Sequence, residues 1–129
     1  MSIRILVVDD HDKVRGILCR LLRNEPEFAV AEAVTGADAL DKTEEFRPEV
    51  VLLDISLPDM DGLKVAARMR KMSPSPEILV VSDYCEGGAE QAFCSGASGY
   101  LLKSDAGREL VAAVRTVHRK ERYLSIRER

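Results

Sequence analysis

The chain lacks the features that mark secreted and membrane-spanning proteins. Its three cysteines, Cys19, Cys85 and Cys94, are odd in number and contain no C-x-x-C spacing. This usage argues against a disulfide framework or a zinc site and favours a reducing cytoplasm. The apolar runs span only a few residues, and the basic-then-apolar start of a signal peptide is missing. We therefore expect neither a membrane segment nor a leader.

Neither positive nor negative charge predominates in the chain as a whole, but one local segment is basic. The formal net charge of −3 gives no general reason to expect nucleic acid as a partner of this domain. From Arg115 to Arg129, however, six basic residues stand against Glu121 and Glu128. This segment is either a solvated helix end, where cations are favoured, or part of a partner contact. The remaining composition, 46% apolar and 32% charged over 129 residues, is that of one globular domain.

Alternating strand and helix patterns indicate an α/β fold. The expected strands are residues 3–8, 28–32, 49–53, 78–82 and 99–102. The segments between them have helical signals. Helices are expected from Val14 to before Pro26, near 35–47, 62–72 and 89–95, and around the apolar face of Leu110, Val111, Val114 and Val117. Such alternation predicts right-handed crossovers and a five-stranded parallel sheet, doubly wound with helices on both faces. The expected strand order is 2-1-3-4-5, as in flavodoxin-like sheets.

Four apolar runs end in polar residues of the kind that phosphoryl chemistry uses. Ile5-Leu6-Val7-Val8 leads into Asp9-Asp10, Val50-Val51-Leu52-Leu53 into Asp54, Ile78-Leu79-Val80-Val81 into Ser82, and Tyr100-Leu101-Leu102 into Lys103. The carboxyl ends of parallel strands share one edge of the sheet, where ligands bind in open α/β folds. We therefore expect these side chains to lie together, with Asp54 between the aspartate pair and Ser82.

This set of groups suits phosphoryl transfer assisted by a cation. Three crowded carboxylates repel one another, so either some protonate or a cation binds among them, and Mg²⁺ suits an all-oxygen site. One carboxylate can then attack phosphorus and become an acyl phosphate. Lys103 supplies a positive charge for the phosphoryl oxygens, and Ser82 supplies a hydroxyl donor.

At these residues the chain resembles the receiver domains of two-component response regulators, along nearly its full length. The resembling segments are Ile5 to Asp10, Leu52 to Gly62, the strand ending in Ser82, and Gly96 to Lys103. The resemblance implies a phosphorylation-switched signalling domain in a bacterial cytoplasm rather than a turnover enzyme. Its implied partners are a sensor histidine kinase and, as an open question, a second copy of the chain after phosphorylation.

The resemblance also implies a role for each site residue. Asp54 would accept the phosphoryl group, and Asp9, Asp10, Asp54 and the main-chain carbonyl of Ser56 would organise Mg²⁺. Ser82 and Tyr100 match the switch positions that report phosphorylation to the face formed by the fourth helix, fifth strand and fifth helix.

Some residues depart from the common family pattern. Ser104 stands where many receivers have proline, and Lys103-Ser104-Asp105 is similar to the NarL/LuxR-type branch that carries a helix-turn-helix. On this basis residues 1–120 form the receiver domain. Residues 121–129 begin a basic linker to a C-terminal DNA-binding domain that the chain does not contain. Asp83 is the second departure, since the residue after the switch hydroxyl is usually small.

Two other classes remain as alternatives. Asp10-His11-Asp12 followed by Ser82 and Lys103 is also similar to a haloacid-dehalogenase-type phosphatase. That reading lacks a later acidic pair and a cap, and it gives Asp54 no role. A flavin- or nucleotide-binding module would have the same topology, but the loop after the first strand has no glycine-rich phosphate cradle. We interpret His11 as a surface-loop residue and His118 as solvated.

Overall fold

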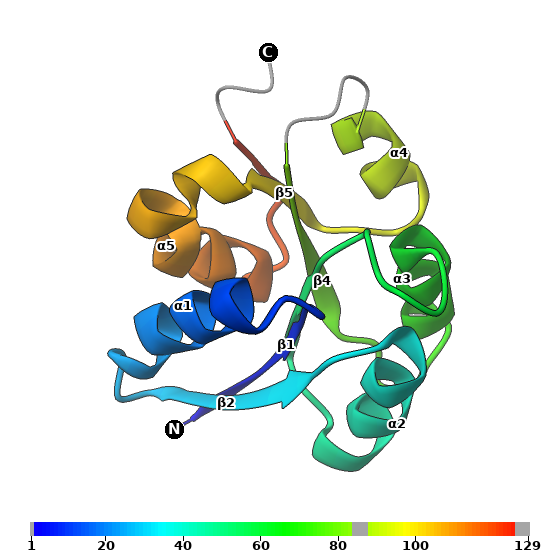
Figure 1. The fold of residues 1–129 in the computed structure, drawn as a ribbon, viewed down its shortest axis with the longest axis horizontal. Helices are drawn as coiled ribbons and strands as arrows, with labels where there is room; N and C mark the ends of the chain where they lie inside the picture. The colour runs from blue at the N-terminus through cyan, green and yellow to red at the C-terminus, as the bar shows by residue number, and fades with distance from the viewer. Residues whose placement is uncertain (1, 84–87, 126–129) are drawn as a thin grey trace.

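A parallel six-stranded sheet forms the centre of the protein. The computed structural model describes residues 2–83 and 88–125 (Figure 1). The strands are β1 (Ile3–Val8), β2 (Phe28–Ala33), β3 (Val50–Leu53), β4 (Glu77–Ser82), β5 (Gly99–Leu102) and β6 (Tyr123–Leu124), in the order β2-β1-β3-β4-β5-β6. The predicted five-stranded order is thus confirmed, and β6 extends it at one edge.

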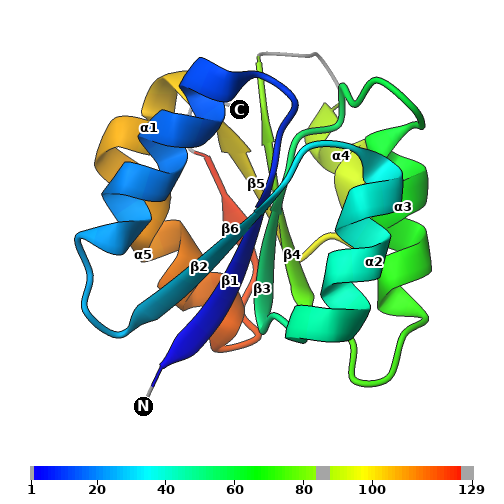
Figure 2. The same cartoon turned by 60° about the horizontal axis from the view of Figure 1, so that its bottom comes forward.

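Helices cover both faces of this sheet. They are α1 (Asp12–Arg23), α2 (Gly36–Phe46), α3 (Gly62–Arg70), α4 (Gly88–Cys94) and α5 (Ala106–His118), with a 3₁₀ turn at Lys103–Asp105. Figure 2 shows α1 and α5 on one face and α2, α3 and α4 on the other. None of the described helices is both long and apolar enough to cross a membrane.

The alternation of side chains along the strands divides the core in two. In β1, Ile5 and Val7 belong to the apolar cluster under α1 and α5, whereas Leu6 and Val8 belong to the cluster under α2, α3 and α4. Successive strand residues point to opposite faces of a sheet, so a strand covered on both sides must be apolar throughout. This requirement explains the uninterrupted Ile/Val/Leu runs in the sequence.

Two helix ends show how local sequence sets the boundaries. Thr35 caps α2, because its Oγ1 accepts a 3.0 Å hydrogen bond from the amide of Asp38. The helix α3 ends at Arg70, two residues before the expected end. The amides of Lys71 and Met72 bond to carbonyls three residues back, which tightens the chain into a turn.

The segment assigned to the linker begins as part of the sheet. The amide of Ser125 donates a 2.9 Å hydrogen bond to the carbonyl of Tyr100, and the Ser125 hydroxyl donates to the buried carboxylate of Asp105. The Arg122 guanidinium lies 4.1 Å from the ring centre of Phe93 on α4.

Residues 126–129 of the expected linker, and Cys85, lie outside the described residues. Among those described, Cys19 is a buried free thiol and Cys94 an exposed one.

Candidate functional site

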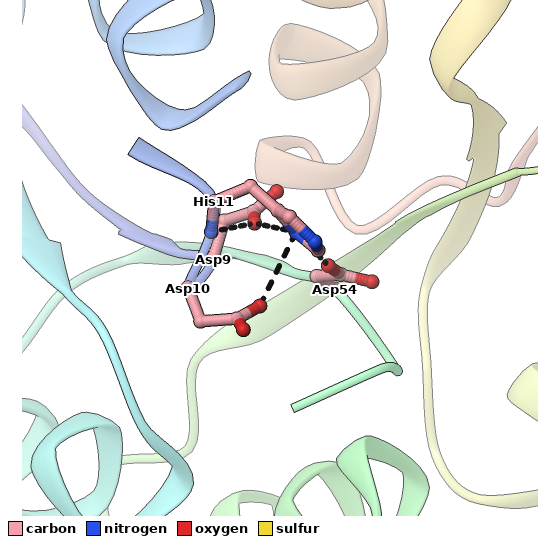
Figure 3. Close-up of side chains that lie close together, drawn as sticks. All are labelled: Asp9, Asp10, His11 and Asp54. Atoms are coloured by element: carbon pink, nitrogen blue, oxygen red, sulfur yellow. Dashed lines mark hydrogen bonds and ion pairs between the residues drawn. The ribbon is translucent and has the colours of Figure 1, made fainter. Parts of the chain in front are cut away.

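The ends of β1 and β3 bring the acidic residues together. Val8 is paired with Leu53 in the sheet, and the amide of Asp54 donates a 3.1 Å hydrogen bond to the carbonyl of Val8. Asp9 and Asp54 therefore leave the sheet side by side, and their side chains are only 1% and 3% exposed. Asp10 is half-buried next to them. The expected cluster of three carboxylates is present at this edge (Figure 3).

Lys103 reaches the same point from the end of β5. Its Nζ lies 3.4 Å from Oδ2 of Asp54 and 3.9 Å from Oδ2 of Asp9. The Lys103 side chain is only 18% exposed, so its charge is only partly screened by water. The lysine supplies one positive charge against the three carboxylates.

The loop after β3 holds the Asp54 carboxylate from the other side. The amide of Ser56 donates a 3.0 Å hydrogen bond to Asp54 Oδ1. Gly62 closes this loop with a 3.2 Å hydrogen bond from its amide to the carbonyl of Ile55. A β-carbon at Gly62 would lie 2.4 Å from the Ile55 α-carbon and 2.8 Å from the Asp54 carbonyl oxygen, so only glycine fits here.

Asp59 fixes the tip of the same loop. Its two carboxylate oxygens accept hydrogen bonds of 2.7 and 3.0 Å from the amides of Gly36 and Ala37, at the start of α2. These two bonds hold the pKa of the Asp59 carboxyl below its usual range. No sequence pattern singled out Asp59, although a carboxylate that accepts hydrogen bonds from the first amides of a helix is a common pairing.

The electrostatics of the cluster are unbalanced. Burial raises the pKa of the Asp54 carboxyl and the nearby Asp9 carboxylate adds to this, while the Ser56 amide and the Lys103 ammonium oppose the rise. Within the described residues, Asp9 Oδ2 and Asp10 Oδ1 are buried and accept no hydrogen bond. Buried oxygens without donors suit a hard cation as their missing partner, so the residues present fit Mg²⁺.

The two switch candidates lie on adjacent strands. Ser82 ends β4 and Tyr100 lies on β5; both are buried. The Ser82 hydroxyl donates a 2.8 Å hydrogen bond to the carbonyl of Asp83, its own neighbour. The side chain of Asp83 is exposed, and Ser56 is exposed in its loop.

Two further residues lie close to the cluster. His11 is the exposed loop residue that the sequence predicts, with 59% of its side chain exposed, and its Nδ1 also lies 3.2 Å from Asp9 Oδ1, 3.3 Å from Asp10 Oδ1 and 3.9 Å from Asp54 Oδ2 (Figure 3). Arg15 on α1 donates a 2.9 Å hydrogen bond to the carbonyl of Asp9. The signal for His11 was its position directly after the aspartate pair.

His118 lies far from this cluster. Its Nε2 is 3.0 Å from Oε1 of Glu49, just before β3 and hence at the opposite edge of the sheet. The imidazole is one-third exposed and paired, rather than simply solvated. It takes no part in the acidic cluster.

Comparisons with known proteins agree with this geometry. The family model described as the response regulator receiver domain matches residues 5–115. The response regulator protein VraR of Staphylococcus saprophyticus is 32% identical over 123 residues, covering 94% of this chain and 59% of that protein. The transcriptional regulatory protein SrrA of Staphylococcus aureus is 34% identical over 128 residues, covering 99% of this chain and 53% of that protein. The chain thus spans between half and three-fifths of the length of these relatives.

Solved structures show the same relationship. A LuxR-family two-component response regulator from Aurantimonas sp. SI85-9A1 superimposes with a TM-score of 0.92 at 33% identity, covering 99% of this chain and 93% of that one. The signal receiver domain of NarL from Mycobacterium tuberculosis superimposes with a TM-score of 0.86 at 36% identity, covering 92% and 97%.

Proposed function

The chain belongs to the response regulator receiver domain family, and from this premise we propose that Asp54 accepts a phosphoryl group from a sensor histidine kinase. One observation carries the proposal. Asp54 is a buried carboxylate at the centre of the sheet edge, with Lys103 on one side and the pair Asp9 and Asp10 on the other. A nucleophile, a countercharge and a cation-binding group thus lie together.

The transfer needs no group beyond those at the site and its cation. A carboxylate oxygen of Asp54 bonds to phosphorus as the phosphorus–nitrogen bond of the kinase phosphohistidine breaks. The imidazole nitrogen leaves with the electron pair and takes up a proton. Lys103 pairs with the phosphoryl oxygens as their charge approaches Asp54. Asp9, Asp10, Asp54 and the carbonyl of Ser56 would hold Mg²⁺, which would supply a Lewis acid for those oxygens.

The output follows from the neighbouring strand. In the proposal the Ser82 hydroxyl leaves the carbonyl of Asp83 to donate to the new phosphoryl oxygens, and Tyr100 reports the change to the face of α4, β5 and α5. The domain modifies itself and turns over no substrate. We assign residues 1–120 to the receiver and 121–129 to the start of a linker; DNA would be contacted only by a domain beyond it. Phosphorylation-dependent pairing of two copies belongs to the same proposal.

The test is the intact mass after incubation with a small acyl phosphate and Mg²⁺. We expect one phosphoryl adduct on the unaltered protein and none on Asp54→Asn, because the amide has nearly the same shape but cannot act as the nucleophile. Asp12→Asn is the matched control, since Asp12 is 88% exposed. An undiminished adduct on Asp54→Asn contradicts the proposal. Loss of the adduct in Asp10→Asn together with its retention in Asp54→Asn would favour the phosphatase alternative.

A further inference from the structure

We propose that His11 is a nitrogen ligand of the cation site, which makes this site select divalent ions such as Mn²⁺ and Co²⁺ over Mg²⁺. The inference rests on the cation site of the proposed function and adds a specificity-determining residue to it. Four residues contribute donor atoms that all lie within 4.8 Å of one another: Asp9, Asp10, His11 and Asp54. His11 is the one member of this set that offers nitrogen.

The distances around His11 Nδ1 are compatible with an octahedral coordination sphere. With donors about 2.1 Å from the ion, neighbouring donors are roughly 3.0 Å apart and opposite donors roughly 4.2 Å apart. Nδ1 lies 3.2 and 3.3 Å from the nearest oxygens of Asp9 and Asp10, close to the neighbouring spacing. Its 3.9 Å separation from Asp54 Oδ2 approaches the opposite spacing. In this structure Nδ1 forms a hydrogen bond with Asp9 Oδ1, and the same position would let it act as a ligand without a change of backbone.

The buried oxygens beside the imidazole are a second, independent indication of a cation site. Asp9 Oδ2 and Asp10 Oδ1 are buried and accept no hydrogen bond from the described protein, and the Asp9 side chain is only 1% exposed. Oxygens withdrawn from water in this way need a positively charged partner. Lys103 Nζ is 3.9 Å from Asp9 Oδ2, too far for a hydrogen bond.

The main chain holds His11 in this place. Its amide donates a 2.8 Å hydrogen bond to Asp9 Oδ1, and its carbonyl accepts a 2.9 Å hydrogen bond from the amide of Arg15. His11 occupies the residue before α1, yet its side chain makes no capping hydrogen bond. The imidazole is therefore available for the carboxylate cluster, as Figure 3 shows.

The kinds of donor atoms at this site determine which divalent ions it should bind more tightly. Mg²⁺ binds oxygen ligands and releases its water reluctantly, so an added imidazole gains it little. Imidazole nitrogen binds transition ions more strongly, and affinity for such sites rises from Mn²⁺ to Co²⁺. A site with three carboxylates and His11 should therefore rank Co²⁺ above Mn²⁺ and both above Mg²⁺.

A competing arrangement makes the opposite prediction. If His11 instead stands in the cluster as an imidazolium ion paired with the carboxylates, every divalent ion must displace it. Removing the imidazole would then raise the affinity for Mg²⁺, Mn²⁺ and Co²⁺ alike. The two arrangements therefore predict opposite changes in the affinity for divalent ions when His11 is replaced: a decrease if the imidazole is a ligand, and an increase if it is a cation that the metal ion displaces.

The experiment measures dissociation constants for Mg²⁺, Mn²⁺ and Co²⁺ by calorimetry at one pH near 8. The proteins are the unaltered chain, His11→Gln and His118→Gln. The control removes the only other histidine, which pairs with Glu49 at the opposite edge of the sheet. We expect His11→Gln to weaken Co²⁺ binding on the order of tenfold and to change Mg²⁺ binding less than about twofold. His118→Gln should match the unaltered chain.

A spectroscopic readout tests the bond itself. Pulsed electron paramagnetic resonance of bound Mn²⁺ should show a nitrogen coupling in the unaltered chain and in His118→Gln, and none in His11→Gln. A missing nitrogen coupling in the unaltered chain, equal affinities in the two variants, or a uniform rise in affinity in His11→Gln overturns the inference. If Mg²⁺ binds and Asp54 is phosphorylated in those cases, the proposed function stands. If no divalent ion binds the unaltered chain, the cation site fails and the inference with it.

Discussion

Lys103 and Asp54 form an ion pair across a strand that lies between them in the sheet. The Nζ of Lys103, just after β5, is 3.4 Å from Oδ2 of Asp54, just after β3, and β4 separates the two strands. The long lysine side chain spans this gap and brings its charge to a carboxylate that is almost fully buried. We therefore expect the pair to stabilise the folded protein as well as to form part of the site.

Replacing this lysine should destabilise the protein when no divalent ion is present. Lys103→Met leaves the buried carboxylates of Asp9 and Asp54 without their nearest ammonium group, at an expected cost of about 1–3 kcal/mol. Urea denaturation in the presence of a chelator measures this. Lys13→Met, at an exposed position of α1, should change stability by less than about 0.5 kcal/mol. Equal stability of the two variants would contradict the role of the ion pair.

Added Mg²⁺ should raise the melting temperature of the unaltered chain. Binding to the folded state adds about 2.7 kcal/mol when the free ion is a hundred times its dissociation constant. Asp10→Asn should reduce the shift, because Asp10 Oδ1 is a buried carboxylate oxygen that accepts no hydrogen bond from the described residues. Asp12→Asn should retain it, since the Asp12 side chain is 88% exposed. A thermal-shift titration with identical shifts for both variants would argue against the site.

Ser82→Ala should separate phosphorylation from its response. The nucleophile Asp54 is unchanged, so the phosphoryl adduct should still form, whereas the hydroxyl proposed to follow it is gone. Amide chemical shifts of residues 99–105 before and after phosphorylation report the response, and we expect them to change less than in the unaltered chain. Ser104→Ala, at an exposed position, is the control. A full response in Ser82→Ala would refute the switch role.

The acid stability of the protein should depend on Glu77. Burial alone would raise the pKa of this carboxyl, but hydrogen bonds from Ser98 and Lys120 and the charge of Arg70 lower it overall. A carboxyl whose pKa is lower in the folded state adds stability above its unfolded pKa of about 4.3, and this contribution is lost as the pH falls through the folded value.

The corresponding variant is Glu77→Gln. It should be less stable than the unaltered chain near pH 7, and the difference should shrink below about pH 4 as the carboxyl of the unaltered chain becomes protonated. Denaturant midpoints across this pH range provide the measurement. Glu45→Gln removes an exposed carboxylate and should show no such trend. A difference for Glu77→Gln that is constant with pH would point to packing rather than charge.

The parts of the site that follow from strand topology were predictable. Asp9, Asp54 and Lys103 each come directly after a buried strand and Ser82 ends one, and a parallel sheet places such residues on one edge whatever the loops do. The direction of a side chain is a different matter. The imidazole of His11 turns toward carboxylates from two strands, and the Ser82 hydroxyl donates to its own neighbour. Both choices depend on distances between atoms that sequence patterns do not encode.

The last strand was beyond prediction for another reason. Tyr123 and Leu124 form too short a segment to show any periodicity, and their pairing depends on the free edge of β5. Two side-chain hydrogen bonds hold this segment in place. Ser125 donates to Asp105, 20 residues earlier in the chain, and Tyr123 donates to Glu109, 14 residues earlier. Only the folded sheet brings these residues together.

The position of β6 also affects how the protein behaves in concentrated solution. A strand with unpaired amides and carbonyls is a template on which a second molecule can add its own strand, and proteins that leave such edges open tend to aggregate. β6 occupies the edge beside Gly99 and Tyr100. A version shortened to end at Lys120 would uncover the backbone of β5, and light scattering should then show self-association that grows with concentration. The pairing of β6 with β5 is therefore expected to limit this self-association.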